Sequence, residues 1–250
     1  MSLQRSQHQK WWQNWWNTMP RSNWKLNIIT ISETWLDESY PDQLLHIDNF
    51  QPPFRRDRPT GRGGGLLTYI HTCLPSTRRL DLEGPNCECI WVEISTQRGP
   101  VLIGKYYRPP GQPAEIRDTF LESLFNSISS AIESNPHILI LTGDFNDRCV
   151  DWNSTHQNSE LGMSLFNLVA QLNLFQIIDE PTRINEYSTS LLDLLITDSP
   201  GLILDNGVLA PISNFDHSVR FCSFSLSCHR DRSFKRGVWN LKKADLYGTI

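Results

Sequence analysis

The sequence predicts a mixed α/β fold, and three patterns along its 250 residues support this class. Four large aliphatic residues at 138–141, followed by a Thr-Gly pair, are typical of a strand that is buried on both faces and ends in a turn. Apolar side chains at helical spacing within 115–133 indicate an amphipathic helix that packs on a sheet. Two stretches at 89–95 and 101–107, separated by a Gly-Pro turn, predict an antiparallel hairpin.

Shorter patterns complete the expected order of elements. Position 159 carries a serine, a residue that favours helix N-caps, ahead of a second helical segment that ends near Leu172. The segment 50–65 is rich in Pro, Gly and Arg and is expected to be a loop. Further strands are expected at 26–31, 66–70, 188–197 and 219–226.

Composition bounds the class of protein. A hydrophobic content of 39% with nine Trp residues is ample for a sizeable core, and no apolar run approaches the length of a membrane span. The N-terminus lacks the continuous apolar region of a signal peptide. A net charge of -4 argues against a generally basic nucleic-acid coat, so a polyanion must be held by a local patch or through metal ions.

The six cysteines contain no Cys-x-x-Cys pair. We therefore expect reduced thiols in an intracellular protein, in preference to a structural zinc site.

The first 25 residues contain four basic residues and no acidic one. Trp11, Trp12, Trp15 and Trp16 recur there at helical spacing, which predicts a short amphipathic helix with an aromatic stripe. Packing on the core is one use of such a stripe, and binding to a membrane surface or a partner is the alternative.

An arginine cluster follows within the predicted loop, at Arg55, Arg56, Arg58 and Arg62. These side chains are either solvated or in contact with a phosphate backbone. The glycine run at 61–65 does not match a phosphate-binding loop, because no Lys-Ser/Thr pair and no helix follow it. We interpret the glycines as a tight entry into the next strand.

Polar residues with useful chemistry follow several predicted strands. Asp144 and Asn146 come directly after the central strand, two residues apart, so their side chains leave the same face; alternatively they cap their own backbone turn. Glu33 follows the first strand, and Tyr107 ends the second strand of the hairpin. A scatter of carboxylates without a dense cage is typical of a Mg²⁺ site.

Asp193 lies in an otherwise apolar strand, where a charge is costly unless it is paired. The candidate partner is the Asp216-His217 pair, because a buried Asp facing a His fixes the imidazole tautomer and raises its pKa. The alternative for this pair is a simple strand cap.

Seven short segments, taken in order, make the chain resemble the endonuclease/exonuclease/phosphatase family. Within it, the chain is most similar to the apurinic-type endonuclease domain of non-LTR (LINE-like) retrotransposons. The segments are I-S-E-T-W-L at 31–36, G-R-G-G-G-L-L-T-Y-I at 61–70, Y-R-P-P at 107–110, L-T-G-D-F-N at 141–146, P-T-R at 181–183, S-L-L-D-L-L-I-T at 190–197 and D-H-S at 216–218.

The resemblance spans residues 26–228, and residues 229–250 are similar to the linker that leads such elements to a reverse transcriptase, which is absent here. The family's opening strand, which ends in an Asn that supports the metal, has no counterpart, so residues 1–25 stand in its place and the domain is expected to be N-terminally incomplete. The family's usual Ser before Asp-His is Phe215.

The resemblance implies a four-layer α/β/β/α sandwich of two facing mixed sheets flanked by helices. It implies a DNA-nicking endonuclease that uses Mg²⁺, with Mn²⁺ as a substitute, in target-primed reverse transcription. The protein would act as a monomer in the nucleus, without a membrane. A catalytically weak remnant that folds and binds nucleic acid is the alternative, and a phosphoinositide or sphingolipid phosphoesterase is a third possibility.

The resemblance also assigns roles to individual residues. Metal binding falls to Glu33, assisted by Asp216. Asp144 would orient and deprotonate the attacking water, and His217, oriented by Asp193, would contact the scissile phosphate. The residues expected to donate to that phosphate are Asn146 and Tyr107, and those expected to contact the nucleic-acid backbone are Arg55, Arg56, Arg58, Arg62 and Arg108.

Overall fold

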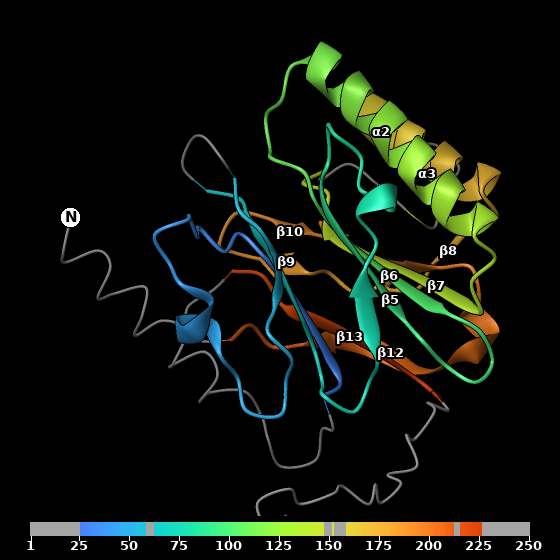
Figure 1. The fold of residues 1–250 in the computed structure, drawn as a ribbon. Coiled ribbons are helices and arrows are strands. Elements are labelled where there is room, and N and C mark those ends of the chain that lie inside the picture. Colours follow the sequence, from blue (N-terminus) through green and yellow to red (C-terminus); the bar gives the residue numbers. More distant parts are fainter. Residues whose placement is uncertain (1–25, 59–62, 148–151, 153–158, 213–215, 227–250) are drawn as a thin grey trace, which may run out of the picture.

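The computed structural model describes residues 26–58, 63–147, 152, 159–212 and 216–226 (Figure 1). The expectations for residues 1–25, for Phe215 and for the linker at 229–250 lie outside these residues.

The largest element is a six-stranded mixed sheet in the order β4-β5-β6-β7-β11-β8. Strands β6 and β7 are parallel, and the other neighbours are antiparallel. The strands are β4 (Ser76–Arg78), β5 (Glu88–Ile94), β6 (Val101–Tyr107), β7 (Ile138–Asp144), β8 (Phe175–Gln176) and β11 (Asp193–Thr197). Every residue of β7 is buried and the strand lies inside the sheet, so the predicted central strand and the predicted hairpin are confirmed.

Two helices, α2 (Ala114–Glu133) and α3 (Glu160–Gln171), cover one face of this sheet (Figure 1). Helix α2 buries Phe120, Leu124 and Ile128 against the sheet, because these residues recur at helical spacing. Helix α3 begins after Ser159, whose Oγ accepts a hydrogen bond of 2.8 Å from the backbone N–H of Gly162. Both predicted helices are confirmed.

A second layer packs on the opposite face of the six-stranded sheet. It contains a three-stranded antiparallel sheet in the order β1-β3-β2 and a two-stranded antiparallel sheet of β12 and β13. A buried apolar core joins the layers, with Leu66 and Ile70 against Ile90, Ile103 and Ile140. These strands are β1 (Ile28–Ser32), β2 (Phe54–Arg56), β3 (Leu66–Ile70), β12 (Ile203–Leu209) and β13 (Val219–Phe224).

The α/β class is confirmed, with two differences in detail. Within the described ranges, the helices α2 and α3 lie on one sheet only. The second layer consists of separate antiparallel sheets instead of one mixed sheet, because in that same part of the chain β3 pairs with β1 and β2 while β12 pairs with β13.

Two local predictions are wrong. The segment expected to be a loop at 50–65 contains strand β2, which pairs with β3. The strand expected at 188–197 is divided into β10 (Thr189–Ser190), which pairs with β9 (Arg183–Ile184), and β11. Between them the backbone N–H groups of Leu192 and Asp193 both donate to Thr182 Oγ1, at 3.0 and 2.9 Å, which takes the chain out of the ladder.

Three short 3-10 helices complete the described elements: Asp42–Leu45, Leu80–Leu82 and Pro200–Leu202. Four cysteines, at positions 73, 87, 89 and 222, are free thiols, as expected for reduced cysteines. Among the described helices, none combines the length and apolar character that crossing a membrane requires.

Candidate active site

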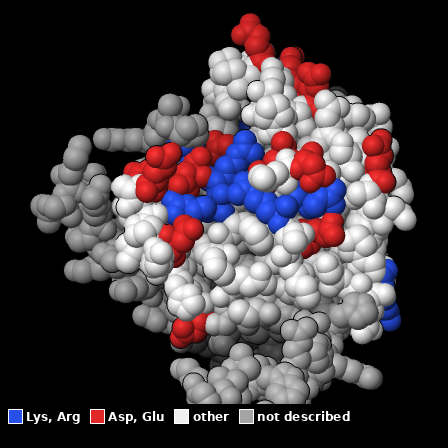
Figure 2. Space-filling model, viewed as in Figure 1, with Lys and Arg blue, Asp and Glu red and all other residues white. Residues whose placement is uncertain are grey.

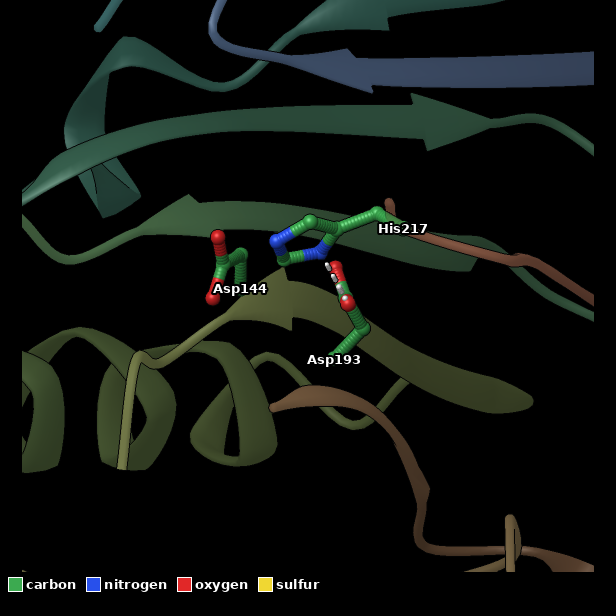
Figure 3. A group of neighbouring side chains, drawn as sticks. All are labelled: Asp144, Asp193 and His217. Carbon is green, nitrogen blue, oxygen red and sulfur yellow. Dashed lines mark hydrogen bonds and ion pairs between the residues drawn. The ribbon is translucent and has the colours of Figure 1, made fainter. Parts of the chain in front are cut away.

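Two carboxylates come together where the interior strands β7 and β11 of the central sheet end and begin. Asp144 ends β7 and Asp193 begins β11, and the two residues are direct partners in the antiparallel register. The imidazole of His217 lies between the two carboxylates (Figure 3). One ligand atom from each of the three residues lies within 4.8 Å of the others.

The structure pairs Asp193 with His217, the partner that the sequence suggested. Nδ1 of His217 lies 2.7 Å from Oδ2 of Asp193. Asp193 is 3% exposed, so its charge requires such partners. Because the carboxylate fixes Nδ1, the other ring nitrogen is the one directed away from Asp193.

The surroundings of the two aspartates shift their pKa values in opposite directions. Burial and the nearby charge of Asp193 raise the pKa of Asp144 to about 6. Although burial alone would raise the pKa of Asp193, Arg220 and His217 hold that pKa below its usual value. Burial opposes protonation of His217, but its hydrogen bond to Asp193 raises its pKa above the usual value.

Two basic side chains near this group, Arg220 and Lys105, were not predicted. Nη1 of Arg220 lies 2.8 Å from Oδ1 of Asp193, and its Nε donates to Thr142 Oγ1 at 3.2 Å. Lys105 is 1% exposed, and burial first, then the charge of Arg220, lowers the pKa of its amine well below the usual value. The signal was present in the sequence, because Lys105 interrupts an apolar strand just as Asp193 does.

The second layer contributes Glu33, which follows strand β1. The hydroxyl of Tyr107 donates a hydrogen bond to Glu33 Oε1. Oε2 of Glu33 accepts from Trp35 Nε1 at 2.6 Å and from the backbone N–H of Gly64 at 2.8 Å. Tyr107 is also the β6 partner of Asp144 in the parallel register, so it connects Glu33 to the aspartate group.

Asn146 and Arg108 hold each other. Nδ2 of Asn146 donates to the carbonyl of Arg108 at 2.9 Å, and Nη1 of Arg108 donates to the carbonyl of Phe145 at 3.0 Å. Arg108 is 5% exposed. This corrects the expectation that Arg108 contacts a nucleic-acid backbone, because its guanidinium is buried and directed at main-chain carbonyls.

Asp216, which was expected to assist at the metal site, pairs with Arg183. Its Oδ2 accepts from Arg183 Nε at 2.7 Å. Among the described residues, Asp216 and Glu33 lie outside the group of Asp144, Asp193 and His217 that could hold a metal ion.

The described arginines of the predicted basic cluster are paired with carboxylates. Arg55 bonds to Asp42 and Asp57, at 2.8 and 2.5 Å. The remaining pairs are Arg56 with Glu83 at 3.7 Å and Arg58 with Glu88. Figure 2 shows basic and acidic side chains interleaved on the face that it presents. Arg62 lies outside the described residues.

Arg58 is the member of this cluster that reaches the candidate site. Its guanidinium carbon lies 5.7 Å from the centroid of the Tyr107 ring. A Cβ atom placed on Gly64 would meet the Arg58 guanidinium at 2.4 Å, and φ at this position is +71°, so a larger residue would be strained and would displace Arg58.

Comparison with known proteins agrees with this geometry. Residues 101–220 match the family model described as Endonuclease-reverse transcriptase. No curated protein has a sequence that matches this chain.

Several solved structures share the fold. The endonuclease domain of TRAS1, a telomere-specific non-LTR retrotransposon, is 19% identical with a TM-score of 0.59 and covers 80% of this chain and 86% of its own. The 3′ phosphatase NExo from Neisseria, bound to a product DNA hairpin, is 15% identical with a TM-score of 0.63, covering 84% and 92%. An AP endonuclease from Archaeoglobus fulgidus is 12% identical with a TM-score of 0.60, covering 80% and 89%.

Proposed function

We propose that this chain is a DNA-nicking endonuclease of a non-LTR retrotransposon, because residues 101–220 match the family model described as Endonuclease-reverse transcriptase and the fold is shared with the TRAS1 endonuclease domain. The observation that carries the proposal is the group of the buried Asp144 and Asp193 with the partly buried His217 at the ends of strands β7 and β11, with Tyr107 and Glu33 beside it. These are the residue types that hydrolysis of a phosphodiester requires.

Asp144 acts as the general base in this proposal. A carboxylate whose pKa is raised to about 6 accepts a proton more readily than an ordinary aspartate and is still ionised near neutral pH. Its Oδ1 accepts from the backbone N–H of Asn146 at 3.0 Å, which fixes the carboxylate for an attacking water.

His217 and Tyr107 bind the phosphate. The hydrogen bond from Asp193 orients the imidazole and favours its protonated form, so His217 donates to a phosphate oxygen as negative charge builds there. Tyr107 supplies a hydroxyl from the neighbouring strand, and Asn146 supplies a side-chain amide once the substrate competes with the Arg108 carbonyl.

The donor set fits a hard divalent cation such as Mg²⁺ or Mn²⁺. Glu33 offers carboxylate oxygens, and a nearby cation would favour the ionised form of Asp144, whose pKa is raised first by burial and then by the charge of Asp193. A bound divalent ion would supply neutralisation of the charge on the phosphate oxygens. We assign Glu33 to hold the ion, which leaves Asp144 to act as the general base.

The family description and the likeness to TRAS1 support a biological setting for this proposal. A nick made in chromosomal DNA leaves a 3′ end from which a reverse transcriptase can begin copying. We propose that this chain makes that nick in the nucleus and works with such a polymerase.

A plasmid-relaxation assay tests the proposal. The full chain should convert supercoiled DNA to the nicked form only when Mg²⁺ or Mn²⁺ is present. Asp144→Ala should lower the rate by about 10² to 10⁴-fold, because removing a group that activates water has this effect.

Asp205→Ala is the matched control, because Asp205 is an exposed aspartate near the far end of the β12–β13 sheet and should leave relaxation unchanged. Relaxation that persists in EDTA or in Asp144→Ala would contradict the proposal. A wild-type chain that never nicks would favour the inactive remnant instead.

A further inference from the structure

Trp35 presents a large aromatic surface beside the candidate site. Its residue surface is 53% exposed, although it follows Glu33 by only two positions. Exposing an indole gives up the stabilisation that its burial would provide.

The backbone around Trp35 adopts a costly conformation. Both Glu33 and Trp35 have positive φ, at 57° and 55°, in the left-handed region that bulky residues avoid. The glycine run holds them there, because the N–H of Trp35 donates to the carbonyl of Gly64 at 3.0 Å and that of Thr34 to the carbonyl of Gly65 at 3.3 Å. Such strain persists where the surrounding structure imposes it, and it clusters at ligand-binding positions.

The indole ring is held at two edges. Its Nε1 donates to Glu33 Oε2 at 2.6 Å. A Cβ atom placed on Gly63 would lie 3.8 Å from Cε2 and Cζ2 of Trp35, which puts the ring edge against the glycine backbone. The ring is thus oriented before any ligand arrives, so binding orders little that is not already ordered.

The chemistry of the neighbouring groups limits what the ring can meet. Glu33 also accepts from Tyr107, and Tyr107 is the register partner of Asp144, so the indole belongs to the same edge as the proposed phosphate site. A nucleic acid bound there by its phosphate would bring its bases to the same end of these strands. Base–aromatic stacking is favourable for every base, since each has a π-face.

We propose that the indole of Trp35 is a stacking platform for a nucleobase next to the scissile phosphate. This inference rests on the proposed endonuclease function and adds to it a contact that selects DNA held in a distorted or unstacked form. The alternative role is that Trp35 serves only to position Glu33 through its indole N–H.

Binding measurements with matched variants separate these roles. All proteins carry Asp144→Asn, so that the DNA stays intact, and fluorescence anisotropy gives the Kd for a short fluorescein-labelled duplex. Trp35→Leu should weaken binding by about 5 to 150-fold, the range of one lost base–aromatic stack. Trp35→Phe keeps the ring but loses the N–H, so it should retain most of the affinity. Phe175→Leu alters an aromatic residue of similar exposure, 45%, at the β8 edge, and should change nothing.

An abasic scan then locates the base. A single abasic nucleotide is moved along the duplex, and each DNA is measured with the Asp144→Asn parent and with the same protein carrying Trp35→Leu. At one position the abasic nucleotide should weaken binding to the parent by the factor that Trp35→Leu loses, and should weaken binding to the Trp35→Leu variant no further. Such non-additivity is the signature of a direct contact.

Three results overturn the platform. They are equal Kd values for Trp35→Leu and its parent, a Trp35→Phe variant as weak as Trp35→Leu, and additive effects at every abasic position. A parent protein that binds no duplex would remove the endonuclease proposal as well, whereas tight binding that ignores Trp35 would remove the platform alone.

Discussion

Arg220 lies 2.8 Å from the Asp193 carboxylate, on the oxygen that His217 leaves open. The side chain of Asp193 is 4% exposed and that of Arg220 is 13% exposed. An always-charged cation therefore neutralises the aspartate that orients the candidate catalytic histidine.

Replacing Arg220 should be strongly destabilising. Arg220→Met leaves the Asp193 charge buried without its cation, which typically costs about 3–5 kcal/mol of folding free energy. Urea denaturation of the full chain measures this loss. Arg183→Met is the control, because it breaks the partly exposed pair with Asp216 and should cost only about 0–1 kcal/mol. If both variants lost the same free energy of unfolding, burial of the ion pair between Arg220 and Asp193 would not explain its contribution.

Asp144→Asn should stabilise the fold while it removes catalysis. The pKa of Asp144 is raised from 3.8 to about 6 in the folded protein, so the folded state favours the neutral acid. The contribution of this group to stability is complete below its unfolded pKa and is lost as the pH rises through about 6. At about pH 8 in EDTA, the neutral amide of the Asp144→Asn variant should therefore raise the free energy of unfolding by about 1–3 kcal/mol.

The pH dependence of this gain is the control. The gain should vanish near pH ~4, where wild-type Asp144 is protonated. Urea denaturation at both pH values makes the comparison. A variant that is less stable than the wild type at the higher pH would show that Asp144 is a favourable anion in the folded protein.

Lys105→Met should also stabilise the fold near neutral pH. Burial and then Arg220 lower the pKa of Lys105, so the folded state disfavours the charged amine that the unfolded chain carries. This penalty is absent above the unfolded pKa of Lys105 and grows as the pH falls below it, so the benefit of Met should shrink in alkaline solution. Thermal denaturation across pH follows it. A destabilised variant would mean that the charge of Lys105 is needed beside Asp144 and Asp193.

Gly64→Ala should disturb both stability and nicking. A methyl group there meets the Arg58 guanidinium at 2.4 Å, and φ at this position is +71°. Gly111 has a similar φ, +68°, but nothing within 4 Å of an added Cβ. Gly111→Ala should thus report the backbone penalty alone, about 1–2 kcal/mol, and leave nicking intact.

The difference in stability between Gly64→Ala and Gly111→Ala measures the cost of the contact between the added methyl group and Arg58. Gly64→Ala should cost about 1 kcal/mol more, because Arg58 must leave Glu88. It should also lower the nicking rate, since the Gly64 N–H supports Glu33. Equal behaviour of the two variants would show that Arg58 moves aside without cost.

The sequence was sufficient for the elements whose signals are local. Strand β7, helix α2 and the β5–β6 hairpin follow from periodicity within a few residues. Strand β2 was missed because its residues, Phe54–Arg56, follow two prolines and pair with β3 only through a long-range contact. The break before β11 depends on the hydroxyl of Thr182, ten residues away from Leu192, which no local pattern reveals.

Those parts of the candidate site that depend on residue type and on position at a strand end could be predicted from the sequence. A partner for Asp193 was predicted because a charged residue interrupts an apolar strand there, and His217 is that partner. Lys105 also interrupts an apolar strand, so the sequence carried the same signal there. Arg220 could not be predicted, because it contacts Asp193 only once strand β13 has packed against the sheet. The arginine cluster was assigned to phosphate because sequence does not show that carboxylates from distant segments already occupy it.

The hydrogen bond from Tyr107 to Glu33 crosses from one layer of the fold to the other. The segment 101–220 carries Asp144, Asp193 and His217, but Glu33 and Trp35 come from the earlier part of the chain. Neither piece holds a complete set of reacting groups. The proposed nicking activity can consequently be tested by fragment complementation. Two halves of this chain, each inactive when expressed alone, should regain the proposed cutting only to the extent that they reassociate after mixing.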